Sequence, residues 1–186
     1  MFIPTEFEGL WIIEPKVFSD ARGYFYESFN QQVFEKETGI SIYFVQDNQS
    51  MSSFGVLRGL HLQFGEYAQA KLVRVLSGEV LDVVVDVRPF SPTFGKSFNI
   101  LLSAENKKQL FIPRGFAHGF VVTSDTAEFF YKCDNFYAPQ HEGGIIYNDM
   151  DLAIDWQIEE KHLIVSERDK KLPTFKEFCE KNSISP

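Results

Sequence analysis

The chain has 186 residues, of which 44% are hydrophobic and 24% are charged, which suits one domain over residues 1–186 with a sizeable core. Its formal net charge of -8 argues against nucleic acid as the main partner, because phosphate backbones are bound by basic surfaces. Two cysteines do not make a disulfide framework, and no apolar run approaches the roughly 18 residues of a membrane span. We therefore expect a cytoplasmic protein without a membrane partner.

Short strands separated by turn residues make up most of the predicted secondary structure. Residues 71–76 and 79–89 flank Ser77-Gly78, a compact turn signal, so we expect them to form a hairpin. The second of these strands alternates with a period of two. In chain order, the elements are a strand at 23–29, a helix at 30–39, strands at 43–50, 56–63, 71–76, 79–89, 96–102, 109–113, 118–124 and 127–133, and a helix at 173–182. So many short strands predict an all-β sandwich or jelly roll.

The two helices lie outside the strand-rich middle of the chain. The first ends at Gly39, a residue that suits a helix C-terminus. The second places Pro173 in its first turn, where the missing N–H of proline has no helical partner to lose. The expected fold is therefore all-β with short flanking helices.

Residues 56–63 read VLRGLHLQ and carry polar groups that a purely structural strand does not need. His61 and Gln63 share a strand face with Gly59, whereas Arg58 has the opposite parity. Glycine often marks a β-bulge, and bulges re-aim side chains beside sites, so we expect a bulge at Gly59 to bring Arg58 and His61 to one side. Other strands add further polar candidates for a pocket: Lys71, His118 and Tyr131.

A bound metal is the first functional class to test. Jelly rolls of the cupin type often hold a metal with a His-x-His pair, whose imidazoles lie on one strand face. Here the pair would be His61 and Gln63, and glutamine is a poor ligand for a transition metal. The later PxGxxH segment of such barrels is present as Pro113, Gly115 and His118. We therefore expect no metal, which leaves His61 free to act as a base.

Eight motifs extend over nearly the whole chain, from about residue 5 to about residue 178. They are DARGYFYESFN (20–30), FVQDNQS (44–50), VLRGLHLQ (56–63), AKLVRVLSGEVLDVVVDVR (70–88), SPTFGK (91–96), IPRGFAHGF (112–120), EFFYKCDNFYAP (128–139) and SERD (166–169). As a highly specific set, they closely resemble the dTDP-4-dehydrorhamnose 3,5-epimerases, which are cofactor-free sugar-nucleotide epimerases of the cupin superfamily.

The resemblance implies a homodimeric jelly roll without a cofactor that epimerises C3 and C5 of dTDP-4-dehydro-6-deoxy-D-glucose. The product, dTDP-4-dehydro-L-rhamnose, would feed L-rhamnose and surface-polysaccharide biosynthesis. The resemblance implies a catalytic set of His61 as base, Tyr131 as acid, Asp169 as the partner of the base and Lys71 near the keto oxygen. It implies substrate binding by Arg22, Glu27, Gln46, Asn48, Arg58, Lys71, His118, Glu142 and Arg168.

Three positions depart from the family pattern. Gln49 stands where many members have histidine, and Arg168 stands where lysine is common. Phe136 occupies the first position of a Tyr-Tyr pair found in many members, which leaves Tyr137. The change at Phe136 bears on how the sugar is held.

The chemistry of the reaction calls for these residue types. Inverting a carbon beside a ketone needs a base on one ring face, an acid on the other and a group that stabilises the enolate oxygen. Histidine suits the first role, and a carboxylate such as Asp169 fixes its tautomer. The hydroxyl of Tyr131 suits the second, and the cation of Lys71 suits the third. The guanidinium groups of Arg22 and Arg58 suit the diphosphate.

Other functions share part of this pattern. An epimerase acting only at C3 or only at C5, or on another nucleotide sugar such as a GDP-heptose, would use the same base and acid. A metal-dependent cupin oxygenase is disfavoured by Gln63. A non-catalytic sugar-binding cupin is disfavoured by the complete set of acid, base and cation.

The resemblance also implies contact between two copies of the chain. A small jelly roll leaves sheet edges that need cover. We expect an N-terminal strand within residues 10–18 to be exchanged between protomers.

Overall fold

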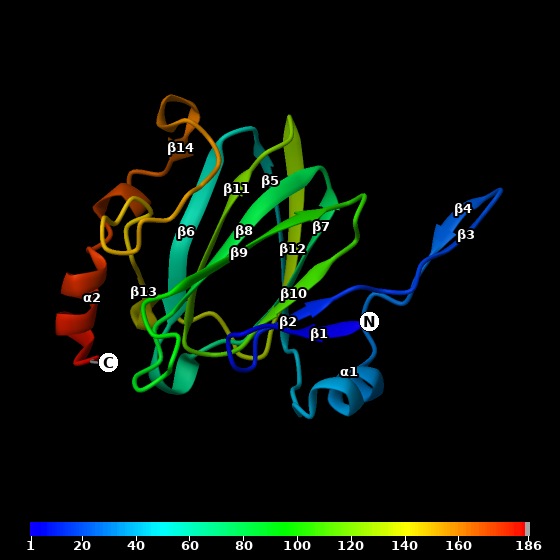
Figure 1. Cartoon of the computed structure of the whole chain (residues 1–186), viewed down its shortest axis with the longest axis horizontal. Coiled ribbons are helices and arrows are strands. Elements are labelled where there is room, and N and C mark those ends of the chain that lie inside the picture. The colour runs from blue at the N-terminus through cyan, green and yellow to red at the C-terminus, as the bar shows by residue number, and fades with distance from the viewer. Residues whose placement is uncertain (185–186) are drawn as a thin grey trace.

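The computed structural model describes residues 1–184 and consists mainly of two sheets that pack face to face (Figure 1). In order across the first sheet, the strands are β1 (Phe2–Pro4), β2 (Trp11–Ile13), β10 (Gln109–Ile112), β7 (Lys71–Ser77), β12 (Thr126–Cys133) and β5 (Gln46–Ser53). Neighbouring strands in this sheet are antiparallel.

The second sheet carries one edge strand that comes from far along the chain. In order, its strands are β13 (Glu142–Gly144), β6 (Val56–Gln63), β11 (Phe116–Val122), β8 (Glu79–Asp86) and β9 (Ser97–Ser103). β14 (Ile164–Val165) also joins β6, and this is a parallel pairing. The other pairs of this sheet are antiparallel, and the two stacked sheets confirm the predicted all-β, cupin-type jelly roll.

Ser77-Gly78 does not close a hairpin, so that prediction was wrong. β7 pairs with β10 and β12 in the first sheet, whereas β8 pairs with β11 and β9 in the second. The turn instead carries the chain from one sheet to the other. A tight turn between two alternating strands predicts a reversal, but pairing between strands adjacent in sequence is only a tendency.

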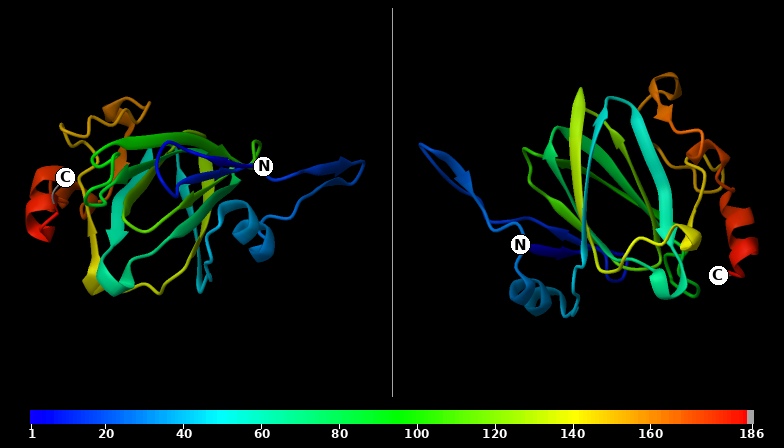
Figure 2. Two further views of the ribbon diagram at one scale, coloured as in Figure 1. Left: turned by 60° about the horizontal axis from the view of Figure 1, so that its bottom comes forward. Right: turned by 180° about the vertical axis from the view of Figure 1, so that it is seen from behind.

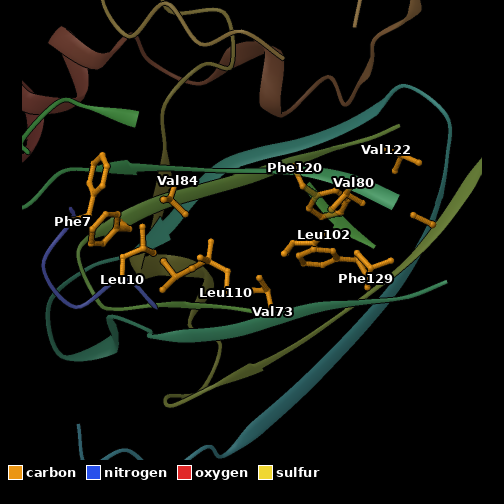
Figure 3. Packing of buried hydrophobic residues seen from close by; sticks show 14 residues of the cluster. Phe7, Leu10, Val73, Val80, Val84, Leu102, Leu110, Phe120, Val122 and Phe129 are labelled. Carbon is orange, nitrogen blue, oxygen red and sulfur yellow. The ribbon is translucent and has the colours of Figure 1, made fainter. Parts of the chain in front are cut away.

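Apolar side chains from both sheets meet between them and form the main core (Figure 3). Val73 and Phe129 come from the first sheet, and Val84 and Phe120 come from the second. The rings of Phe120 and Phe129 stack with centroids 4.2 Å apart, so the two sheets are joined by a direct aromatic contact.

Each sheet also carries an apolar cluster on its outer face. On the second sheet, Leu81 packs in one apolar cluster with Trp156 and Phe178 from the C-terminal part of the chain. On the first sheet, Phe34 packs edge-on against Phe111 with ring centroids 4.9 Å apart. The C-terminal segment is therefore held on the outside of the second sheet by apolar burial.

The two predicted helices are confirmed. α1 (Gln31–Thr38) is capped by the side chain of Asn30, and α2 (Phe175–Asn182) begins with a capping box at Thr174. Pro173 precedes this cap and does not lie in the first turn as predicted. No helix among residues 1–184 is long and apolar enough to cross a membrane. Four short 3-10 helices complete the structure: η1 (Gly65–Tyr67), η2 (Pro139–His141), η3 (Glu160–His162) and η4 (Asp169–Lys171).

One hairpin extends away from the sandwich. It consists of β3 (Phe18–Asp20) and β4 (Gly23–Phe25), and it projects from the side of the first sheet in all views (Figures 1 and 2). The strand predicted at residues 23–29 is therefore shorter than expected. Three aromatic side chains on the hairpin, Phe18, Tyr24 and Phe25, are 54%, 61% and 70% exposed. The hairpin therefore presents apolar surface that its own chain covers only in part.

The turn between the sheets supplies a test of the fold. Gly78 has φ of 75°, and a Cβ there would lie 1.9 Å from the carbonyl oxygen of Thr126. Gly39 has a similar φ of 71° but open space around the same position. We expect Gly78→Ala to lower the free energy of unfolding by roughly 3 kcal/mol or more, and Gly39→Ala by about 1–2 kcal/mol. Urea unfolding measures both free energies. Equal losses of stability in the two variants would contradict the clash expected between a side chain at position 78 and the Thr126 carbonyl.

Candidate active site

A cavity of about 580 Å³ opens between the two sheets. Its walls come from β5, β6, β7, β11 and β12 together with residues 164–169. The structure brings eight of the predicted site residues to this cavity: Asn48, Arg58, His61, Lys71, His118, Tyr131, Arg168 and Asp169. Residues far apart in the sequence thus share one pocket.

The predicted base and its carboxylate are in direct contact. His61 Nε2 and Asp169 Oδ1 lie 2.7 Å apart, and the backbone N–H of Gly59 donates to Asp169 Oδ2 at 3.4 Å. The parallel pairing of β14 with β6 brings the chain alongside β6, so that η4 can place Asp169 beside His61. Burial raises the pKa of the Asp169 carboxyl, but the hydrogen bonds from His61 and Gly59 outweigh it and leave this pKa below its ordinary value.

The predicted bulge at Gly59 is confirmed by the register of β6 against β11. His61 lies opposite His118 and Arg58 lies opposite Phe120, so β6 has one more residue than β11 between these pairs. Gly59 has φ of 125°, and a Cβ there would lie 2.5 Å from the Cα of Gly119. Only glycine fits this backbone. The extra residue lets Arg58 and His61 both line the cavity.

The predicted acid lies on the opposite sheet from the base. Tyr131 belongs to β12 in the first sheet, whereas His61 belongs to β6 in the second. Burial is the main effect that raises the pKa of the Tyr131 hydroxyl to about 12, and the nearby carboxylate of Glu142 adds to it. The phenol therefore keeps its proton at neutral pH and remains available as a donor.

Lys71 lies beside this tyrosine. Its ammonium nitrogen is 5.8 Å from the centroid of the Tyr131 ring. Burial lowers the pKa of Lys71, and the nearby carboxylates of Asp82 and Glu142 partly offset this effect. A cation held in a poorly hydrated site interacts strongly with any negative charge that develops near it.

A second histidine in the cavity also has a carboxylate partner. His118 Nε2 lies 2.9 Å from Asp82 Oδ2, and the Asp82 side chain is completely buried. The alternation of the strand at 79–89 puts Asp82 and Val84 on one face, but it does not identify this contact. A single carboxylate in a regular alternation gives no hint of its partner on another strand.

The rim of the cavity is a connected polar network. The hydroxyl of Tyr137 donates to Glu142 Oε2 at 2.8 Å, and Arg168 forms an ion pair with the same carboxylate. Burial raises the pKa of Glu142, but the bonds from Arg168 and Tyr137 leave it below its ordinary value. Gln46 accepts from the N–H of Tyr137 at 3.0 Å and donates to Asn48 Oδ1 at 3.1 Å. Gln46 and Glu142 therefore adjoin the residues of the cavity wall.

Gln63 interrupts the metal-binding pattern. Both the nitrogen and the oxygen of its side-chain amide form hydrogen bonds with the backbone. Its nitrogen donates to the carbonyls of Tyr67 and Phe136 at 2.7 and 3.1 Å, and its oxygen accepts from the N–H of Ala138 at 2.7 Å. This side chain ties together the loops that follow β6 and β12. The spacing of His61 and Gln63 alone did not reveal that role.

Two predicted substrate residues lie elsewhere in the chain. Arg22 is at the turn of the β3–β4 hairpin, where it is exposed and pairs with Asp20 at 2.6 Å. Glu27 lines a separate cavity of about 420 Å³ between the base of this hairpin, α1 and the N-terminal strands. Within one chain, neither residue is brought to the main cavity.

The three departures from the family pattern have different surroundings. Gln49 donates to Glu128 at 3.3 Å across the β5–β12 pair. Arg168 takes part in the rim network described above. The side chain of Phe136 is 62% exposed, and its backbone carbonyl accepts from Gln63.

Known proteins resemble this chain over most of its length. A family model described as dTDP-4-dehydrorhamnose 3,5-epimerase matches residues 4–177. The chain is 57% identical over 176 residues to the dTDP-4-dehydrorhamnose 3,5-epimerase of Escherichia coli (strain K12), covering 95% of each.

Solved structures extend the comparison to the fold. The dTDP-4-dehydrorhamnose 3,5-epimerase of Elizabethkingia anophelis matches with a TM-score of 0.92 and 58% identity, covering 95% of this chain and 97% of that one. The dTDP-6-deoxy-D-glucose-3,5-epimerase of Legionella pneumophila, solved in complex with dTDP-4-keto-L-rhamnose, matches with a TM-score of 0.90 and 50% identity, covering 95% and 93%. The chain belongs to the dTDP-4-dehydrorhamnose 3,5-epimerase family.

Proposed function

We propose that the chain is a cofactor-independent isomerase that converts dTDP-4-dehydro-6-deoxy-D-glucose into dTDP-4-dehydro-L-rhamnose, a precursor of L-rhamnose for surface polysaccharides. One observation carries this proposal. The His61–Asp169 pair and Tyr131 line a single cavity from opposite sheets, and Lys71 lies beside Tyr131. This is the arrangement that inversion at a carbon beside a ketone requires, and membership of the family supports the choice of substrate.

The first step removes a proton from the ring carbon next to the C4 ketone. Because Nε2 of His61 is bound to Asp169, Nδ1 is the ring nitrogen left to act as the base. The proton passes to Nδ1, and the electron pair of the C–H bond forms the enolate. The Asp169 carboxylate stabilises the resulting imidazolium, which is the role of the carboxylate in other histidine–carboxylate pairs.

The second step returns a proton to the opposite ring face. The Tyr131 hydroxyl gives its proton to the carbon; the tyrosinate then regains a proton from water, and the His61 imidazolium releases its proton to water, which resets both groups for the next exchange. Since removal and return take place on opposite faces, the carbon is inverted. The same exchange at C3 and at C5 gives the L-configured product, and general acid–base help of this kind is typically worth about 10²–10⁴-fold.

The negative charge at the C4 oxygen needs a partner during both steps. Lys71 supplies a half-buried cation next to the acid. A preorganised donor aimed at a developing oxyanion is typically worth about 10²–10³-fold. No redox cofactor enters these steps because the substrate already carries its ketone.

The nucleotide is held by charged groups nearer the mouth of the cavity. Arg58 is exposed on β6, and its Nε donates to Ser52 at 3.2 Å. A planar guanidinium fixed in this way can bind phosphate oxygens with two parallel hydrogen bonds. The phosphate contact is thus separate from the base, although Arg58 and His61 are only three residues apart.

Replacement of the base supplies the most direct test of its role. We expect His61→Ala to lower turnover by about 10³-fold, while the affinity for thymidine diphosphate stays within about threefold, because Arg58 is untouched. His162, exposed and outside the cavity wall, is the matched control, and His162→Ala should keep nearly full turnover. Turnover assays and calorimetric titration measure both properties. Retention of more than a few per cent of activity in His61→Ala would rule out this base.

Replacement of the acid should separate the two half-reactions. Tyr131→Phe keeps the ring but removes the proton donor, so His61 should still exchange the ring proton with solvent deuterium. We expect deuterium uptake at C3 and C5 to fall by less than about tenfold while net epimerisation falls by about 10²-fold or more. Proton NMR in deuterated water follows both. Equal rates of epimerisation in Tyr131→Phe and the parent would assign the acid to another group, with Tyr137 as the next candidate.

We further propose that the protein is a homodimer in which a second copy covers the β3–β4 hairpin. The exposed aromatic side chains of the hairpin and the apolar cavity at its base support this proposal. The hairpin also carries Arg22, a predicted substrate residue that lies away from its own cavity. A hairpin docked on a second copy would bring Arg22 to the pocket of the partner. β2 pairs with β1 and β10 of its own chain, and exchange of an N-terminal strand stays a prediction.

Light scattering at micromolar concentration should give a mass twice that of one chain. We expect Phe25→Glu to lower the dimer affinity by at least about tenfold, because it places a charge in the proposed contact. Met150 lies between β13 and η3 and is 90% exposed. It offers the control Met150→Glu, which should remain dimeric. A monomeric parent protein would refute the homodimer, and a dimer unaffected by Phe25→Glu would refute the role of the hairpin.

We place the enzyme in the cytoplasm. Cys133 and Cys179 are free thiols, which is usual for a reducing compartment.

A further inference from the structure

Asp82 is an unusual residue for the middle of a β-sandwich. It lies on β8 with an exposed fraction of 0%, and its Oδ2 contacts His118 Nε2 at 2.9 Å. Its other oxygen, Oδ1, is also buried and has no hydrogen-bond partner among the residues that the structure describes. Its neighbours at alternate positions on the same strand, Val80 and Val84, belong to the apolar core.

A second carboxylate on the same strand shows what a purely structural aspartate looks like here. Asp86 is equally buried, but it accepts hydrogen bonds from Arg88, Ser91 and Thr93. These bonds fix the turn that leads from β8 into β9. Asp82 has no comparable set of donors, and a buried carboxylate oxygen without a donor costs folding free energy. Local structure therefore does not account for Asp82.

The position of His118 suggests what Asp82 does. His118 lines the cavity, and its ring lies against Phe129 with centroids 6.0 Å apart and an interplanar angle of 29°. With Nε2 bound to Asp82, the remaining ring nitrogen Nδ1 is the one that can reach a bound substrate. Asp82 also contributes to the negative potential at Lys71, which lines the same cavity as His118.

We propose that Asp82 is a positioning residue for the epimerisation, which holds His118 in one orientation and stabilises its charged form, so that Nδ1–H donates to the C4 oxygen of the enolate beside Lys71. This proposal rests on the proposed function. It gives the cavity two histidine–carboxylate pairs with different roles: Asp169 supports a base that gains a proton, and Asp82 supports a donor that keeps one.

The proposal predicts that Asp82→Asn lowers turnover without lowering stability. Because Oδ1 is an unpaired buried oxygen, Asp82→Asn should leave the melting temperature unchanged or raise it. Because the bond from His118 to the C4 oxygen strengthens only when that oxygen becomes negative, the same variant should lower kcat by about 10²-fold and leave KM and thymidine diphosphate affinity within about threefold. The matched control is Asp86→Asn, which should lower the melting temperature and leave kcat within about twofold.

A second variant tests whether Asp82 acts through His118. In a protein that already carries His118→Gln, the further change Asp82→Asn should alter kcat by less than about threefold, because the group that it supports is gone. An unaltered loss of about 10²-fold in this background would show that Asp82 acts by another route and would overturn the proposal.

The experiment measures kcat, KM, thymidine diphosphate affinity and melting temperature for the parent protein and these variants, with turnover followed by NMR. Turnover of Asp82→Asn within threefold of the parent would overturn the positioning role. So would a loss of kcat accompanied by a fall in melting temperature as large as that of Asp86→Asn. If the parent protein itself does not turn over the sugar nucleotide but binds thymidine diphosphate, the proposed function fails, and the role of Asp82 in it falls as well.

Discussion

The hydrogen bond between His61 and Asp169 joins parts of the chain that are 108 residues apart. It depends on how the segment that carries Asp169 packs against the second sheet. β14 must lie parallel to β6 before η4 can present Asp169 to the histidine. The segment around β14 is in turn held on the outer face of the second sheet by an apolar cluster that includes Trp156 and Phe178. Packing on the outside of the sandwich therefore sets the geometry of the pocket on the inside.

The interior of the sandwich is divided between apolar packing and charge. Aromatic stacking between Phe120 and Phe129 closes the core next to the cavity, and the same Phe129 ring lies against His118. Lys71 lines this cavity and Asp82 is buried behind His118, in surroundings where Coulomb interactions are stronger than in water. A chain with a net charge of -8 can thus bind an anionic nucleotide sugar, because the local arrangement of cations decides binding and the net charge does not.

Local sequence patterns predicted the parts of the fold that depend on neighbours in the chain. The strand expected at 56–63 has those bounds, both helices form, and the bulge at Gly59 follows from a glycine flanked by polar residues of opposite parity. The pairing of β7 and β8 was wrong because the choice of partner strand depends on contacts far along the chain. The contact of Asp82 with His118 and the bonds of the Gln63 amide were missed for the same reason. The resemblance named the site residues, but the register between strands shows how most of them meet.

The central claim is that His61 and Tyr131 act on opposite faces of one sugar ring. A crystal structure with a bound dTDP-linked deoxyhexose tests it most directly. The ring should lie in the main cavity with His61 Nδ1 on one face and the Tyr131 hydroxyl on the other, each about 3–3.5 Å from C3 or C5, and with the C4 oxygen toward Lys71. A ring with both side chains on the same face, or a sugar bound outside this cavity, would contradict the account.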